Sequence, residues 1–431
     1  MTRKRLTFAF FIVCALLLLV SCTPEDAEWT TAPEAETEAV AEAELLVLLD
    51  NGATDFKIVR AEGAKGFQLD TAVAVNNRMR TTLSRDFKII DDWMNPNGPA
   101  VNTDHEILLF ETNRPETAAA LEDLDFEGYI IRVTDSKIVI VGASPAACSE
   151  AIFRFIDRLI PEYTKDGVTA FPVGLEVRGE FKPSDLDVYA ALREGRNICA
   201  DYNVVFKYSQ KDDFDAAQGA ATDGKFAYVI MKKNVSGVET DRVIKVDMET
   251  WSAVLESDEM PLDHANDMTY DPVKKQLVVV NMLDNLVSII DPETLTLTEQ
   301  KPLSYGTWGV GYIDGAGQYA FLAYGSPSGL VITDGDFNPI RSSALADTTG
   351  YVGQGMDADA EYAYVPLSPQ SGTKDNIIQV FEIKTGKYIG KITLNTLMES
   401  ESMFHVGNDF YLHFNNQGSK IATLEFYEKF E

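Results

Sequence analysis

Polar side chains recur at the starts of similar segments in the C-terminal half of the chain, and their chemical types suit the recognition of a sugar. They are Gln218, Asn266, Asp267, Trp308, Gln354 and Glu401, with His264 close by in the sequence. Amides and carboxylates form paired hydrogen bonds with hydroxyl groups, and the indole of tryptophan stacks on the face of a sugar ring. If the fold gathers these segments around one centre, we expect a site for a carbohydrate or a cell-wall glycan. The alternative is that these groups bond only to backbone and water.

The same segments leave an enzymatic role open. Asp267, Asp357 and Glu401 are carboxylates that could serve as acid and base in the hydrolysis of a glycosidic bond. However, the sequence contains no phosphate-binding Gly-Lys loop, no serine elbow and no haem-attachment motif, and its four histidines are not spaced like zinc ligands. We therefore expect a non-catalytic binding protein without a metal or cofactor. A glycoside hydrolase and a protein–protein scaffold at the cell envelope are the alternatives.

The segments that carry these residues repeat with a period of roughly 45 residues, a length that is typical of β-propeller blades. An apolar strand that ends in an acid and a turn occurs four times, and the acids are Asp247, Asp291, Asp334 and Glu382. A second strand-like run precedes each of these strands, a shorter one begins each unit, and five such beginnings can be recognised. Four strands per period of this length predict propeller blades. Because a carboxylate at such a turn can accept backbone N–H groups two residues on, we assign these acids a structural role.

The two ends of the repeat region predict how the ring of blades closes. The fifth unit stops after its third strand, 421–427, and an orphan strand, 203–208, lies upstream of the first unit. We expect this strand to complete the last blade, because an unpaired strand would leave an open sheet edge. The prediction is a mainly β protein with a five-bladed β-propeller over residues 197–431, its last blade closed by an upstream strand. The units resemble the YVTN-type repeats of bacterial surface propellers.

Residues 45–180 alternate strand-like and helix-like segments and predict a small α+β domain, followed by a linker over 181–196. The helices argue against reading this region as additional propeller blades. Within it, Arg114 belongs to a Thr-Asn-Arg-Pro-Glu segment, and we expect this arginine to tie its loop to the sheet rather than to contact a ligand.

Two stretches of this region, EILLFETNRPET and GYIIRVTDSKIVIVGASPAACSEAIFRFID, carry a second resemblance. Together they cover roughly residues 104–160 and are similar to the accessory α+β domain that precedes the catalytic barrel in hexosaminidase-like and α-glucuronidase-like glycoside hydrolases. No barrel of adequate length follows in this chain. The resemblance therefore implies a setting related to carbohydrates and transfers no catalytic residue.

The N-terminus predicts export and lipid attachment. Three basic residues precede an apolar run over 6–20, and Leu19-Val20-Ser21-Cys22 resembles the lipobox of bacterial lipoproteins. This resemblance implies a signal peptide over 1–21, a lipid on Cys22 and an extracytoplasmic protein anchored to the bacterial cell membrane. Residues 22–44 contain eight acidic residues and no basic one, which predicts a flexible tether.

The charge and the cysteines limit the partners and the crosslinks that we expect. A net charge of −30 excludes nucleic acid as an expected partner and leaves the membrane, reached through the lipid, and a glycan or a surface protein. Cys148 and Cys199 remain besides Cys14 of the signal peptide and Cys22, and the sequence leaves open whether these two form a disulfide.

Overall fold

The computed structural model describes residues 44–429, except for 65–66, 96, 98–102, 183–184, 210–213, 215, 237, 263, 371–374, 395, 397 and 417. Residues 43–431 cluster as one compact unit. The predicted signal peptide, the lipidation site at Cys22 and nearly all of the predicted tether lie outside the described residues. Within the described part, none of the helices combines the length and the apolar character that a membrane crossing requires.

The N-terminal part of the described chain is a small α/β region. Its strands are β1 (Leu45–Asp50), β2 (Lys57–Arg60), β3 (Lys88–Asp91), β4 (Glu106–Leu109), β5 (Gly128–Val133), β6 (Lys137–Gly142), β7 (Thr164–Lys165), β8 (Val168–Pro172) and β9 (Glu176–Glu180). Its helices are α1 (Phe67–Leu83), α2 (Pro115–Glu122), α3 (Pro145–Arg154), the π-helix η1 (Phe155–Leu159) and α4 (Ile160–Glu162). A six-stranded sheet has the order β3-β2-β4-β6-β5-β9, and a three-stranded sheet has the order β1-β8-β7.

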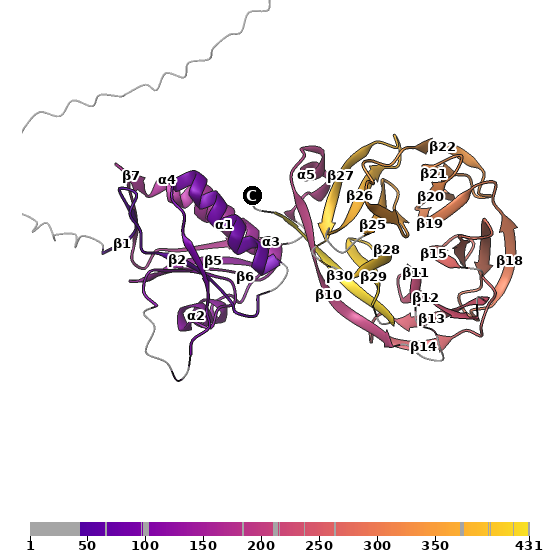
Figure 1. Ribbon diagram of the computed structural model, residues 1–431, viewed down its shortest axis with the longest axis horizontal. Coiled ribbons are helices and arrows are strands. Elements are labelled where there is room, and N and C mark those ends of the chain that lie inside the picture. The colour runs from indigo at the N-terminus through magenta and orange to yellow at the C-terminus, as the bar shows by residue number, and fades with distance from the viewer. Residues whose placement is uncertain are drawn as a thin grey trace, which may run out of the picture. The chain divides into compact units, whose positions relative to one another are not determined.

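Helices cover both faces of the six-stranded sheet. Figure 1 shows α1 and α3 on one face and α2 on the other. Strand β6 illustrates the pattern, because Ile138 and Ile140 pack into the core under α1 and α3 while Val139 and Val141 pack into the core under α2. A strand that is buried on both faces reads as a continuous apolar run, which is how this segment stands in the sequence.

Arg114, which precedes α2, is 3% exposed and ties that helix to the sheet. Its Nε and Nη2 donate to the two carboxylate oxygens of Glu106 on β4 at 2.9 and 3.0 Å, and its Nη1 donates to the carbonyl of Asp92 at 3.0 Å. Such a paired arrangement between a guanidinium and a carboxylate is geometrically specific. The structural role predicted for Arg114 is confirmed.

The remainder of the chain is almost entirely β-strand. The strands are β10 (Ile198–Ser209), β11 (Ala216–Thr222), β12 (Phe226–Val235), β13 (Val238–Asp247), β14 (Ser252–Glu256), β15 (Ala265–Asp271), β16 (Gln276–Asn281), β17 (Leu286–Ile290), β18 (Leu297–Pro302), β19 (Gly306–Ile313), β20 (Gln318–Tyr324), β21 (Gly329–Thr333), β22 (Pro339–Ser343), β23 (Tyr351–Gly353), β24 (Asp357–Ala358), β25 (Tyr362–Pro369), β26 (Asn376–Glu382), β27 (Tyr388–Leu394), β28 (Glu399–Val406), β29 (Asp409–Asn415) and β30 (Gly418–Glu428).

These strands form several four-stranded antiparallel sheets. Three are separate, with the orders β11-β12-β13-β14, β15-β16-β17-β18 and β19-β20-β21-β22, and a nine-stranded sheet contains the remaining strands. Figure 1 shows the sheets arranged around a common centre, with β11, β15, β19 and β28 innermost. The protein is therefore mainly β, with a small N-terminal α/β region and sheets whose arrangement is consistent with a β-propeller.

Strand β10 joins the two ends of the repeat region. It pairs antiparallel with β30 over eleven register positions, from Ile198 opposite Glu428 to Ser209 opposite Gly418. Its first three residues also pair in parallel with β27. The strand upstream of the repeats thus lies against the last strand of the chain, which is the pairing that the two ends of the repeats predicted.

The turn acids also have the predicted structural role. Asp247, Asp291 and Asp334 each accept a hydrogen bond from the backbone N–H two residues on, at 3.0, 2.8 and 2.9 Å. Glu382 differs, because it accepts from the hydroxyl of Thr385 at 2.7 Å. The side chain of Glu382 is one methylene longer, and its carboxylate bonds to a neighbouring side chain. The shorter aspartates bond to the backbone instead.

The segment predicted as a linker contains a short helix, α5 (Val188–Arg193). Tyr189 of this helix stacks on Tyr362 with 4.0 Å between ring centroids, and its hydroxyl lies 2.5 Å from that of Tyr364. Cys148 and Cys199 are both free and buried, and the core under α1 and α3 includes both of them together with Tyr427 of β30. The α/β region and the last strands therefore share apolar packing.

Candidate functional site

Asp267 joins four of the innermost segments at the centre of the sheets. It lies on β15 and has no exposed surface. Its Oδ2 accepts from the backbone N–H groups of Val310 on β19 and of Met356, just before β24, both at 2.9 Å, and its Oδ1 accepts from the hydroxyl of Ser402 on β28 at 2.6 Å. Burial raises the pKa of Asp267 well above its usual range, and these hydrogen bonds oppose the rise. This predicted site residue holds inner strands together.

Asn266 and Gln218 are also bonded inside the protein. The amide nitrogen of Asn266 donates to the carbonyl of Trp308 at 2.5 Å and also to the carbonyl of Gln354. The amide nitrogen of Gln218 donates to the carbonyl of Ala217 at 2.7 Å. Both side chains are buried. The structure thus brings Asn266, Trp308 and Gln354 together, because the amide of Asn266 bonds to the backbone carbonyls of the other two.

The remaining predicted residues of the inner strands differ in exposure, because Trp308 and Gln354 are partly exposed whereas Glu401 is buried. The indole of Trp308 stacks on Tyr324 with 4.9 Å between ring centroids, and Gln354 donates to Glu399 at 3.0 Å. Glu401 is 3% exposed, and burial, together with the neighbouring Glu399, raises its pKa well above its usual range.

His264 lies apart from these residues, beside the oppositely charged side chains of Glu239 and Lys232. Its Nδ1 lies 3.0 Å from a carboxylate oxygen of Glu239 and 3.2 Å from Nζ of Lys232. Such contacts combine opposite charges at a partly buried site.

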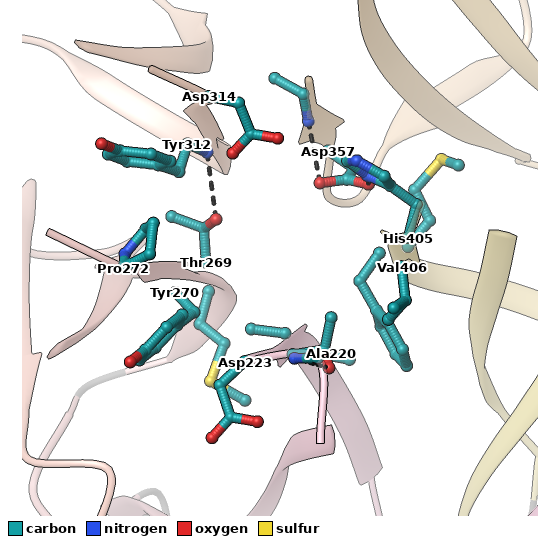
Figure 2. Close-up of a pocket in the computed structure, with 17 residues that line it drawn as sticks. Ala220, Asp223, Thr269, Tyr270, Pro272, Tyr312, Asp314, Asp357, His405 and Val406 are labelled. Carbon is teal, nitrogen blue, oxygen red and sulfur yellow. Dashed lines mark hydrogen bonds and ion pairs between the residues drawn. The ribbon is translucent and has the colours of Figure 1, made fainter. Parts of the chain in front are cut away.

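A cavity of about 180 Å³ lies at the other end of the inner strands. We call it the axial cavity. It is lined by the last residues of β11, β15, β19 and β28 and by β24, and its polar and aromatic lining residues are Asp223, Tyr270, Tyr312, Asp314, Asp357 and His405. Figure 2 shows these side chains around the opening, with the carboxylate of Asp314 turned towards Asp357.

An ion pair forms one side of the axial cavity. Nδ1 of His405 lies 2.6 Å from Oδ2 of Asp357, and Oδ1 of Asp357 accepts from the backbone N–H of Ala358 at 2.9 Å. The charge of Asp357 raises the pKa of His405 to about 9, against the effect of burial. The imidazole is therefore charged at neutral pH.

Asp314 is the other charged group that faces the axial cavity. Among the described residues, no side chain or backbone group donates a hydrogen bond to its carboxylate. Burial raises the pKa of Asp314, the charge of His405 opposes this, and Asp357 and Asp359 add to it. The residue is exposed, so its carboxylate oxygens are accessible to water and to a ligand. Within the described part of the chain, no three His, Cys, Asp or Glu side chains are placed to hold a metal ion.

Sequence reasoning named Asp357 only as a possible acid or base, and it did not single out Asp314 or His405 as ligand contacts. The missed signal is the acid at the end of four of the five inner strands, at Asp223, Asp271, Asp314 and Asp359. These positions repeat as regularly as the turn acids that the sequence analysis did use. These recurring acids lie at or just after the last residues of the inner strands, which is the end at which the axial cavity lies.

The sequence matches no known protein family and no curated protein. Among solved structures, the chain is similar to the glutaminyl cyclase of Myxococcus xanthus, with 10% identity, coverage of 54% of this chain and 99% of that one, and a TM-score of 0.37. It is also similar to hydrazine synthase of Kuenenia stuttgartiensis, with 15% identity, coverage of 48% and 57%, and a TM-score of 0.30. A third is the β-propeller domain of Cps50 from Myceliophteria thermophila, with 10% identity, coverage of 50% and 67%, and a TM-score of 0.29. Similarities this low give no information about function.

Proposed function

We propose that this protein is a non-catalytic binding protein of the bacterial cell surface that takes a carbohydrate in the axial cavity of a five-bladed β-propeller. The blades are the three separate four-stranded sheets and the two halves of the nine-stranded sheet. In this proposal β10 serves as the outer strand of the last blade, next to β30. Residues 1–21 are the signal peptide, and a lipid on Cys22 anchors the protein to the membrane.

The observation that carries the proposal is the composition of the axial cavity. Asp314 offers carboxylate oxygens without a hydrogen-bond donor from the described residues, and the pair formed by Asp357 and His405 adds a polar edge. Tyr270, which is partly exposed, supplies aromatic surface beside these groups. A small number of oriented polar groups next to aromatic rings is what a sugar-binding site requires.

The size of the cavity indicates how much of a ligand it can hold. Its volume of about 180 Å³ is smaller than the roughly 300–1,000 Å³ of sites that enclose drug-sized molecules. It therefore suits one sugar unit, such as the end of a longer glycan. We place the ligand here and not among Gln218, Asn266 and Asp267, because all three are buried, the amide nitrogens of the first two donate within the protein, and both carboxylate oxygens of Asp267 accept from it.

A glycan array followed by calorimetry with Tyr270→Ala tests the proposal. We expect wild type to bind at least one glycan and Tyr270→Ala to bind it about tenfold more weakly, since one aromatic contact contributes about 1–1.5 kcal/mol. Tyr388→Ala is the matched control, because Tyr388 is an exposed tyrosine on an outer strand. Its affinity should equal that of wild type.

Three results would count against this function. Failure of wild type to bind any glycan would defeat it, and co-purification of a partner protein in that situation would favour the scaffold. Release of reducing sugar that is lost in Asp314→Asn would favour a glycoside hydrolase.

A further inference from the structure

A second cavity, of about 500 Å³, lies where the helix α5 meets the last strands of the chain. We call it the lateral cavity. Residues 185–189, which include the start of α5, form one wall, and residues 408–410 at the start of β29 and 424–426 of β30 form the other. Its volume falls within the roughly 300–1,000 Å³ of cavities that bind ligands. It shares no lining residue with the axial cavity, so the two cavities are separate.

The lateral cavity leaves the edge of an apolar core partly uncovered. Phe410 belongs to that core and is 7% exposed. Further apolar side chains pack against the core, are only partly buried and line the cavity, namely Leu186, Val188, Tyr189, Leu424 and Phe426. They come from both walls, and the rings of Phe410 and Phe426 lie 5.2 Å apart between centroids. Aromatic and aliphatic surface of this kind is typical of the centre of a protein–protein contact.

The charged side chains that surround this apolar surface are all acidic. Asp185, Asp187 and Asp409 are exposed, and Glu425 is partly buried. Asp185 and Asp187 each use one carboxylate oxygen to accept a backbone N–H at 2.8 Å, and they keep their negative charge. None of the described lining residues is a lysine, an arginine or a histidine. The lateral cavity therefore combines an apolar floor with a negatively charged rim.

The groups next to the rim do not cancel its charge. Burial raises the pKa of Glu425, its hydrogen bonds oppose the rise, and the charge of Asp201, which lies opposite it in the pairing of β10 with β30, adds to it. Arg196 lines a neighbouring cavity that shares part of the 185–189 wall, but this arginine is paired with Glu428 at 3.1 Å. A cationic group of a partner would therefore be attracted to the rim without competition from a lining base.

Charge also argues against two occupants that the chain itself could supply. Residues 23–44 contain eight acidic residues and no basic one, so the predicted tether has the same sign as the rim. A second copy of the chain would bring a net charge of −30 to the contact. Like charges brought together at an interface suppress association. The complementary occupant is a different molecule that carries positive charge and apolar side chains together.

We infer that the lateral cavity is a docking site for a basic segment of a partner protein, in which lysines or arginines alternate with aromatic or aliphatic residues. The apolar side chains of this segment cover the exposed edge of the core, and its cations meet Asp185 and Asp409 at the rim. A cation that lies over an aromatic ring of the lining adds a further attraction. The inference does not depend on a carbohydrate in the axial cavity.

Calorimetry at about 0.15 M salt, where long-range attraction is screened, tests the inference with three capped peptides of equal length. One alternates lysine with tryptophan, the second glutamate with tryptophan, and the third lysine with serine. We expect wild type to bind the lysine–tryptophan peptide about tenfold more tightly than either of the others, because only this peptide matches both the floor and the rim.

Two pairs of variants locate the binding. Asp409→Lys should weaken binding of the lysine–tryptophan peptide about fivefold, because it reverses a charge of the rim. Asp336→Lys makes the same change of net charge at an exposed turn outside the cavity and should bind as wild type does. Leu186→Ala should weaken binding about fivefold as well, whereas Leu283→Ala, at an exposed turn, should not. Circular dichroism checks the fold, which Asp409→Lys should preserve because Asp409 is exposed.

Several results would overturn this docking site. Equal binding of the two lysine peptides would show attraction by surface charge alone, and equal binding of the two tryptophan peptides would remove the role of the rim. Equal affinities of Asp409→Lys and Asp336→Lys would place the peptide elsewhere. Failure of wild type to bind the lysine–tryptophan peptide at concentrations up to about 1 mM would also exclude the site.

Discussion

His405 and His413 lie on neighbouring strands, and their surroundings drive their protonation in opposite directions. The charge of Asp357 raises the pKa of His405 to about 9. Burial lowers the pKa of His413 to about 4, and its two ring nitrogens lie 2.7 Å from the carbonyl of Gln218 and 2.6 Å from the hydroxyl of Ser419. One imidazole is thus charged and the other neutral at pH 7.

Nuclear magnetic resonance titration of the histidine rings should show these two values, at about 9 for His405 and about 4 for His413. The stabilisation from His405 is fully present below its unfolded-state pKa of 6.5 and is lost as the pH rises through about 9. The stabilisation linked to His413 is present above 6.5 and is lost as the pH falls through about 4. His405→Asn should therefore flatten the alkaline side of the stability profile and leave the acid side unchanged. Titration of both rings near 6.5 would contradict this description.

Individual residues show which roles the sequence can predict and which it cannot. The roles of Asp247 and Asp291 could be predicted, because a turn acid bonds to the backbone two residues away and the interaction is local. The role of Asp314 could not, because it depends on whether Tyr319 donates to its own sheet or to the neighbouring one. Asp267 was predicted as a ligand contact, and its burial by three other inner segments is likewise set by tertiary structure.

At the scale of elements, the strand β10 is buried on both faces at its start and alternates between core and solvent near its end. Phe206 is 5% exposed and packs in a cluster with Phe214, Ala217 and Ile421. The next residue, Lys207, is exposed, as the alternation along a strand requires. The seam between β10 and β30 is therefore held by apolar packing as well as by its hydrogen bonds.

Phe206→Ala should lower the free energy of unfolding by about 3–5 kcal/mol, because it leaves a cavity where a buried ring was. Lys207→Ala on the same strand is the matched control and should change it by less than about 0.5 kcal/mol. Urea unfolding followed by fluorescence measures both. If the two variants were equally stable, β10 would not be part of the cooperative core.

The repeats made most strands predictable, since each unit shows the same apolar runs and turns. The helix α5 was not predicted, because six residues form no stable helix alone and this one is held by the stacking of Tyr189 on Tyr362. The inner strand β24 is reduced to two residues, Asp357 and Ala358, so its strand pattern in the sequence is weak.

At the scale of the whole molecule, the net charge bears on the lipid anchor that we propose. The chain has a net charge of −30, and removal of residues 1–21 takes away three basic residues and no acidic one, which leaves −33. An anionic membrane repels such a body over a Debye length of about 8 Å at physiological salt. A flexible tether of the predicted length reaches roughly 25 Å, which is enough to hold the folded part beyond that distance.

Fractionation of cells that express Cys22→Ser tests the lipid anchor. Wild type should be found with the membranes and should incorporate labelled palmitate, and Cys22→Ser should lose the label and leave the lipidated membrane pool. Cys14→Ser, within the predicted signal peptide, should behave as wild type. Palmitate labelling of Cys22→Ser would show that the lipid is attached elsewhere.

The pairing of β10 with β30 also gives the sheets a circular order, although the chain itself is linear. The two ends of the repeat region meet inside one sheet, over eleven register positions. A single proteolytic cut in a surface connection between two sheets opens the ring at one place only, while this seam and the other connections remain. We expect such a nicked molecule to release no fragment until the seam itself separates.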